Sequence, residues 1–92
     1  MQIEASVPML ISDCTGGRTR FPLEADTLGK ALRRLVETYP LLRVHLYDEQ
    51  GDVRQHVLLY YNDENVAWLD DPEHIALKPG DKLRVLQAVS GG

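Results

Sequence analysis

Apolar and polar residues alternate over residues 3–7, which is the pattern of a half-buried β-strand. Pro8 interrupts this pattern, so we expect the strand to lie at a sheet edge there or to kink. Residues 9–11 are predicted to continue the strand. A turn over residues 13–17 and a return strand over residues 18–23 would complete a first hairpin.

The pattern then changes to a helical period. Asp26 and Thr27 can both cap the first turn of a helix, and Pro40 disfavours a helical Tyr39 and ends the element. Gly29 lies inside the helix, where it suggests close packing against a neighbour. One apolar stripe at helical spacing is predicted to face the core: Leu28, Ala31, Leu32, Leu35, Val36 and Tyr39.

The second half of the chain is predicted to consist of strands separated by polar turns. The apolar-rich residues 41–47 suit a helical turn, and Asp70-Asp71-Pro72 starts a capped turn. The predicted strands cover residues 53–61, 66–68 and 82–89, and the intervening turns include residues 48–52, 62–65 and 78–81.

A helix between strands, with too few strands to close a barrel, predicts an α+β fold. We expect a mixed sheet of about five strands that one main helix covers on one face. If that helix covers the faces of the last two long strands that carry Val57, Leu59, Leu83 and Val85, the opposite faces carry Leu58, Tyr60, Arg84 and Leu86. An exposed apolar cluster on a small domain indicates a binding site for a partner protein. The alternatives are that loops cover this face or that the register differs by one residue.

Composition narrows the functional class. The chain has 92 residues, enough for one small domain, with 43% hydrophobic and 26% charged residues. The formal net charge of −4 argues against binding to nucleic acid or to an anionic membrane. No apolar run approaches the roughly 20 residues that cross a bilayer, and no secretory signal is visible. The expected location is the cytoplasm.

Metal and catalytic sites have little support. His45, His56 and His74 lack the spacing that places two ligands on one helix face, and Cys14 is the single cysteine. Cys14 is predicted to be a bystander in a loop. The paired carboxylates at residues 48–49 and 70–71 lie in predicted turns. We therefore expect no metal, no bound cofactor and no catalytic group belonging to this chain.

The sequence closes on Gly91-Gly92, separated from the last predicted strand by Ser90. Together with four earlier segments, this ending resembles the ubiquitin-like β-grasp sulfur carriers, the family of the molybdopterin-synthase small subunit and the thiamin-pathway sulfur carrier (MoaD/ThiS). The long stretch over residues 39–52 resembles the branch that serves a cysteine synthase and related thio-metabolite pathways. The segments that carry the resemblance are Thr15-Gly16-Gly17, Ala25-Asp26-Thr27-Leu28-Gly29, Asn62-Asp63-Glu64-Asn65-Val66, Lys78-Pro79-Gly80-Asp81 and Ala88-Val89-Ser90-Gly91-Gly92.

The resemblance implies a β-grasp domain over residues 1–89 and a flexible diglycine tail over residues 90–92. It implies a carrier and not an enzyme. A partner related to ubiquitin-activating enzymes would use ATP and magnesium to adenylate the Gly92 carboxylate, and sulfur would then replace AMP. The resulting thiocarboxylate would donate sulfide to a biosynthetic enzyme. Two glycines suit this role because they can thread a narrow channel into a partner's active site. Leu58, Tyr60, Arg84 and Leu86 would supply affinity for the partner.

Three other interpretations stay open at this point. The same tail suits a ubiquitin-like modifier joined to lysine through Gly92, or the small subunit of a complex like molybdopterin synthase. A β-grasp interaction module with an accidental glycine ending is the third. Gly92 is also compatible with exposure by cleavage of a longer precursor. The sequence does not reveal the sulfur source or the recipient pathway.

Overall fold

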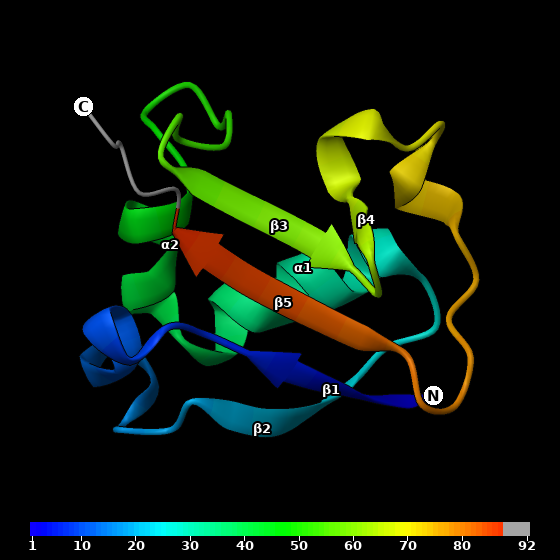
Figure 1. The fold of residues 1–92 in the computed structure, drawn as a ribbon, viewed down its shortest axis with the longest axis horizontal. Helices are drawn as coiled ribbons and strands as arrows, with labels where there is room; N and C mark the ends of the chain where they lie inside the picture. Colours follow the sequence, from blue (N-terminus) through cyan, green and yellow to red (C-terminus); the bar gives the residue numbers. More distant parts are fainter. Residues whose placement is uncertain (88–92) are drawn as a thin grey trace.

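Five strands form one mixed sheet in the order β2-β1-β5-β3-β4 within residues 1–87, the part of the chain that the computed structural model describes (Figure 1). The central pair, β1 and β5, is parallel, and the other neighbouring pairs are antiparallel. The strands are β1 (Gln2–Ser6), β2 (Arg20–Glu24), β3 (Val57–Tyr61), β4 (Glu64–Asn65) and β5 (Lys82–Gln87). The expected α+β fold with five strands is confirmed.

Helix α1 (Leu28–Thr38) lies across one face of the sheet (Figure 1). Thr27 caps its first turn, since the hydroxyl oxygen accepts a hydrogen bond from the Lys30 amide at 3.3 Å. The helix ends before Pro40, as predicted, and Pro40 then begins a second helix, α2 (Pro40–Leu46). Proline suits this position because the N–H groups of the first helical turn have no partner within the helix. The N–H that proline lacks therefore costs no helical hydrogen bond.

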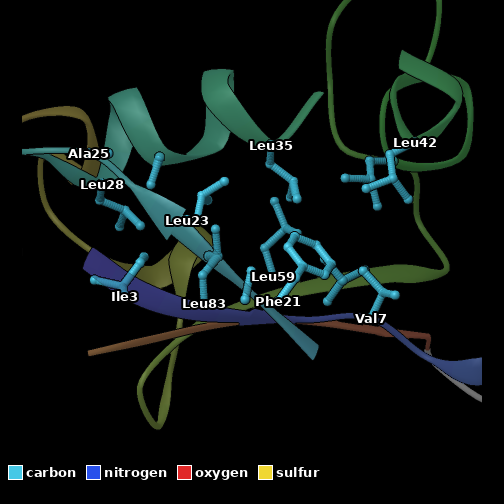
Figure 2. Close-up of a cluster of buried hydrophobic side chains, with 14 of the residues drawn as sticks. Ile3, Val7, Phe21, Leu23, Ala25, Leu28, Leu35, Leu42, Leu59 and Leu83 are labelled. Carbon is cyan, nitrogen blue, oxygen red and sulfur yellow. The ribbon is translucent and has the colours of Figure 1, made fainter. Parts of the chain in front are cut away.

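The core fills the space between the sheet and the two helices (Figure 2). Leu28 and Leu35 of α1 and Leu42 of α2 point toward the sheet, and Leu59 and Leu83 meet them from below (Figure 2). The other members of the predicted helix stripe divide by depth: Ala31 is fully buried, whereas Leu32, Val36 and Tyr39 are partly buried against the core.

The first connection differs from the prediction. Residues 9–11 do not continue β1 but begin a 3-10 helix, η1 (Met9–Thr15). Two hydroxyl groups favour the turns over a strand: Ser12 Oγ donates to the Met9 carbonyl at 2.8 Å, and Thr15 Oγ1 donates to the Ser12 carbonyl at 3.0 Å. Of the two alternatives at Pro8, the edge strand is wrong, because β1 lies between β2 and β5; the chain instead leaves the strand after Ser6, and Pro8 precedes η1.

Two predicted strands are shorter or absent. The strand expected over residues 53–61 is confined to Val57–Tyr61, because Val53 forms a bridge with Tyr47 and the Arg54 amide donates to the Leu46 carbonyl at 2.9 Å. The strand expected over residues 66–68 is a 3-10 helix, η2 (Val66–Trp68), which the Asn65 side chain caps at 2.9 Å. The turn expected at Asp70-Asp71-Pro72 is present as a further 3-10 helix, η3 (Pro72–His74), but the expected cap is wrong, because the Asp71 side chain makes no capping hydrogen bond.

Close packing at Gly29 is confirmed. A Cβ atom at this position would overlap the Glu73 carboxylate, which pairs with Arg33 of the same helix. The final strand, expected to reach residue 89, is described as far as Gln87. The predicted boundary between the domain and the 90–92 tail falls outside the described residues, so it stays a prediction.

Candidate functional site

The four residues predicted to bind a partner form two cross-strand pairs on the sheet face opposite α1. In the antiparallel ladder of β3 and β5, Leu58 lies directly opposite Leu86, and Tyr60 lies directly opposite Arg84. The residues that alternate with them on the two strands are buried on the inner face, which places the four side chains on the outer face: Val57, Leu59, Leu83 and Val85. We call these four residues the outer-face cluster. Their binding role stays a prediction.

The outer-face cluster is less open to water than the sequence suggests. Leu86 has an exposed fraction of 36%, whereas Leu58 and Tyr60 are half-buried. Directly opposed side chains in an antiparallel pair lie close enough to shield each other. The cluster is therefore a packed, largely apolar surface. Of its two leucines, Leu86 is the more accessible to solvent.

Arg84 is oriented by the turn between β3 and β4. Its Nη2 donates to the Asn62 carbonyl at 3.3 Å and lies 3.7 Å from Asp63 Oδ1. The turn needs Asn62 in the left-handed region (φ 55°), which asparagine tolerates better than most residues. The guanidinium thus lies at the rim of the cluster with 42% of its side chain exposed, still open to a partner's carboxylate or carbonyl groups.

A buried carboxylate, which the sequence analysis missed, fixes this turn. Asp81 is 8% exposed and accepts hydrogen bonds from the Tyr61 hydroxyl at 2.5 Å, the Lys78 amide at 2.8 Å and Asn62 Nδ2 at 3.3 Å. Asn62 Oδ1 in turn accepts from the Lys82 amide at 2.9 Å. We call these contacts the Asp81 network. It connects the β3–β4 turn to the start of β5 and so positions Arg84.

The Asp81 network shifts two pKa values in opposite directions. The hydrogen bond from Tyr61 is the largest cause that lowers the pKa of the Asp81 carboxyl, because it favours the ionised form. Burial, followed by the bond to Asp81, raises the pKa of the Tyr61 hydroxyl to about 12. Both groups therefore keep their hydrogen-bonding forms at neutral pH. We interpret this network as structural, since its hydrogen bonds join the β3–β4 turn to the residues on either side of Asp81.

The predicted tail residues Ser90, Gly91 and Gly92 lie outside the described residues. Leu86 is the residue before the last described position of β5, and Gln87 pairs with Val57 of β3. The outer-face cluster therefore borders the strand end from which the sequence continues to Gly92.

A second group of exposed apolar residues lies on η1 and α2, two segments that the sequence predicted only as part of a strand and as a helical turn. Met9 and Leu10 in η1 are each 81% exposed, and Leu41 and Val44 on α2 are 64% and 65% exposed. On α2 the buried leucines are Leu42 and Leu46, so the outward residues could have been found from helical spacing had the helix been assigned in full.

Within residues 1–87, no group of three or more His, Cys, Asp or Glu side chains is arranged to hold a metal ion. The same described residues contain no helix long and apolar enough to span a membrane. Cys14 is partly buried in η1 against the core. His74 lies on the surface and its ring nitrogen Nδ1 is 2.9 Å from Asp71 Oδ1.

The parallel central pair, the antiparallel hairpins on both sides and the single main helix across one face define a ubiquitin-like β-grasp fold. The chain belongs to the ThiS family, whose sequence model matches residues 8–92. The family predicted from the sequence is thereby confirmed.

Three similar proteins illustrate the relationship. Small archaeal modifier protein 1 of Haloferax volcanii is 31% identical over 84 residues, which cover 89% of this chain and 91% of that protein. CysO of Mycobacterium tuberculosis, described as an antigen, has 29% identity and a TM-score of 0.78, with 95% and 99% of the two chains covered. A chain of the Amycolatopsis orientalis BexX/CysO complex has 24% identity and a TM-score of 0.78 over 98% and 99%, a likeness that shows the fold.

Proposed function

We propose that this protein carries sulfur on the carboxylate of Gly92. The main support is the family match, which extends over residues 8–92 and so includes the diglycine. A carboxylate is a poor electrophile until one oxygen becomes a leaving group. In the proposed first step the Gly92 carboxylate attacks the α-phosphate of ATP on a partner enzyme, which releases pyrophosphate and leaves an acyl-adenylate. Magnesium and ATP belong to the partner's site.

In the second step a sulfur nucleophile forms a bond to the Gly92 carbonyl carbon, and the bond to AMP breaks. With hydrosulfide as the nucleophile, the products are the thiocarboxylate, AMP and a proton. The thiocarboxylate then donates sulfide to a biosynthetic enzyme of a cysteine, cofactor or thio-metabolite pathway. The protein acts as a co-substrate in these steps, and the need for ATP and an activating enzyme suits the cytoplasm.

The outer-face cluster is proposed to hold the folded domain on its partners while Gly92 enters their active sites. Leu58, Leu86 and Tyr60 supply apolar contact area, and Arg84 supplies a polar contact at the rim. Binding energy in protein interfaces is concentrated in a few such residues. Glycine at positions 91 and 92 leaves no side chain to block a narrow channel.

The proposal is tested by intact-mass measurement of the purified chain after incubation with ATP, magnesium, sulfide and its activating enzyme. Carriage of sulfur predicts the mass increase that follows replacement of one oxygen by sulfur, located by fragmentation at Gly92. A chain lacking Gly91 and Gly92 is the control and should fold without acquiring the mass change. The proposal is wrong if the mass of the full chain does not change although the same enzyme preparation transfers sulfur to a reference carrier protein.

Conjugation to lysine is the second candidate, favoured by the 31% identity to a protein named a modifier. It uses the same activated Gly92 but ends in an isopeptide bond to a lysine amine. Mass spectrometry of proteins from the native host distinguishes the two. Tryptic peptides that carry residues 85–92, the segment after Arg84, joined through Gly92 to a lysine support the modifier, whereas a thiocarboxylate at Gly92 supports the carrier.

A further inference from the structure

Gly92 can reach only a short distance from the folded domain. It follows Gln87, the last described residue of β5, by five residues. A fully extended chain spans at most about 3.6 Å per residue, so the Gly92 carbonyl carbon lies within about 18 Å of Gln87. An enzyme that acts on this carbon in a recessed active site must therefore place the mouth of that site against the surface around the end of β5.

The elements around the end of β5 follow from the register of the strands. β1 is parallel to β5 with Ser6 beside Arg84, so η1, which begins soon after β1 ends, lies at this end of the sheet. β3 is antiparallel to β5, and its first residue, Val57, pairs with Gln87. The segment that leads into β3 therefore arrives at the same end. That segment begins with α2, which packs against η1 near the end of β5 (Figure 1).

Both η1 and α2 expose apolar side chains there. Met9 and Leu10 on η1 and Leu41 and Val44 on α2 form what we call the η1–α2 patch, with exposed fractions between 64% and 81%. Leu41 and Val44 are three residues apart, so they share one face of α2. Exposed apolar groups that gather on two adjoining elements indicate a binding surface.

The chemistry proposed at Gly92 explains why the partner's channel needs an apolar mouth. An acyl-adenylate is a mixed anhydride. Water that reached it would add to the Gly92 carbonyl carbon, break the bond to AMP and release protons, which returns the original carboxylate without sulfur. An enzyme that forms this intermediate must exclude water from its active site. Apolar contact around the base of the entering chain provides that exclusion.

We propose that the η1–α2 patch docks on the apolar rim of the active-site channel of the activating enzyme and closes the channel mouth while Gly92 is adenylated. This inference rests on the proposed activation of Gly92, which sulfur carriage and conjugation to lysine share. It gives the two exposed apolar surfaces separate roles. The outer-face cluster holds the domain through the face of the sheet, and the η1–α2 patch excludes water at the sheet end from which the sequence continues to Gly92.

Polar substitution of the patch tests the proposal. Met9→Gln combined with Leu41→Gln removes apolar contact at exposed positions, and urea unfolding followed by circular dichroism checks the fold. Trp68→Gln is the matched control, because Trp68 is also 81% exposed but belongs to η2, away from the end of β5 (Figure 1). With ATP and the activating enzyme, the double variant should raise the KM for this chain about tenfold, and Trp68→Gln should leave it unchanged.

A second measurement examines the closure of the channel. With sulfide present, the ratio of AMP released to thiocarboxylate formed should rise at least about twofold in the double variant, because water then competes for the acyl-adenylate. Trp68→Gln should keep the ratio of the unmodified chain.

A third measurement uses the length of the chain after β5. Eight glycine and serine residues inserted after residue 89 add up to about 29 Å of reach, so the patch need no longer meet the rim. In this lengthened chain, Met9→Gln with Leu41→Gln should change KM by less than about twofold, because the contact that the two residues make has already been lost.

Several results overturn the proposal. It is wrong if the double variant keeps either the KM or the AMP ratio of the unmodified chain, if Trp68→Gln has the same effects, or if the double variant raises KM equally in the lengthened chain. An effect confined to sulfide transfer to the biosynthetic enzyme assigns the patch to that enzyme instead. If the double variant does not fold, Leu10→Gln with Val44→Gln replaces it.

Failure of the proposed function gives a different result. In that case the unmodified chain releases no AMP, although the same enzyme preparation activates a reference carrier protein. An unmodified chain that is activated normally, with variants that behave as it does, removes only the role of the η1–α2 patch.

Discussion

The inner and outer faces of strands β3 and β5 use similar residues in opposite surroundings. On the inner face, Leu59 lies opposite Val85, and their exposed fractions are 4% and 2%. On the outer face, one residue along each strand, Leu58 lies opposite Leu86, which is 36% exposed. The two pairs differ mainly in what covers them, because α1 and α2 lie over only one face of the sheet (Figure 2).

This difference separates the residues that hold the fold together from those that a partner can use. Burial of an aliphatic side chain against the helices contributes about 1.5–3 kcal/mol to folding. The outer pair obtains only part of that gain, because one side of it still meets water. Contact with a partner would supply the rest of that gain, which is the role proposed above for the outer-face cluster.

The largest expected difference between the faces is found within β5. Leu83 is 0% exposed, so Leu83→Ala should lower the free energy of unfolding by about 2–5 kcal/mol through loss of apolar contacts and creation of a cavity. Leu86→Ala, three residues along the same strand, should cost less than about 1 kcal/mol. Urea unfolding followed by circular dichroism measures both. Similar losses in the two variants would show that the outer face also belongs to the folding core.

The second effect concerns the Asp81 network, which supports the edge of the outer face from within. Asp81→Asn should destabilise the fold by about 1–3 kcal/mol, because the amide cannot replace a carboxylate that accepts three hydrogen bonds. Asp63→Asn, at an exposed carboxylate in the neighbouring turn, is the control and should change stability by about 0.5 kcal/mol or less. Equal behaviour of the two variants in urea would contradict a structural role for the network.

The same network predicts how stability depends on pH. The pKa of Asp81 is lowered from its ordinary value of 3.8, so its stabilisation is present above pH 3.8 and is lost as the pH falls through the folded pKa. The pKa of Tyr61 is raised from 10.0 to about 12, so its stabilisation is complete below pH 10 and is lost as the pH rises toward about 12. Tyr61→Phe should reduce both dependences, as thermal unfolding across the two pH ranges will show.

The contrast between the faces was predictable from sequence because it depends on alternation alone. Residues two apart in a strand share a face of the sheet. The apolar helix stripe of Leu28, Ala31 and Leu35 must pack on an apolar face, which identifies the inner face of the strands. The cap at Thr27 was also visible, since a hydroxyl residue precedes the stripe directly. These features depend on neighbours in sequence, which a single sequence records.

Features that depend on distant residues could not be predicted in this way. Asp81 and Tyr61 are 20 positions apart, and no sequence pattern near either residue predicts the hydrogen bond between them. The 3-10 helix η1 was mistaken for a strand because three consecutive apolar residues, Met9–Ile11, have no period that distinguishes the two. Hydroxyl-to-backbone bonds from Ser12 and Thr15 decided the conformation there.

A smaller effect is expected on binding when the outer pair is shortened. If the outer-face cluster binds the activating enzyme, Leu58→Ala and Leu86→Ala should each weaken affinity by about 1 kcal/mol, or about fivefold. Because the two leucines are directly opposed, the binding free energy lost in the double variant should differ by about 0.5 kcal/mol from the sum of the two single losses. Isothermal titration with the enzyme measures this coupling. Unchanged affinity in all three variants would remove the cluster from the interface.

The smallest expected effect concerns Arg84, where the outer face meets the β3–β4 turn. Its side chain is 42% exposed, so Arg84→Ala should change the free energy of unfolding by about 0.5 kcal/mol or less despite the contacts with Asn62 and Asp63. A charge at the rim of an interface acts mainly on the association rate. If the outer-face cluster binds the proposed activating enzyme, Arg84→Ala should slow association with it at low salt, and the difference should shrink as salt is added. Arg84→Lys is the matched control: it keeps the charge and should keep the rate, whereas equal slowing in both variants would assign the effect to the geometry of the guanidinium.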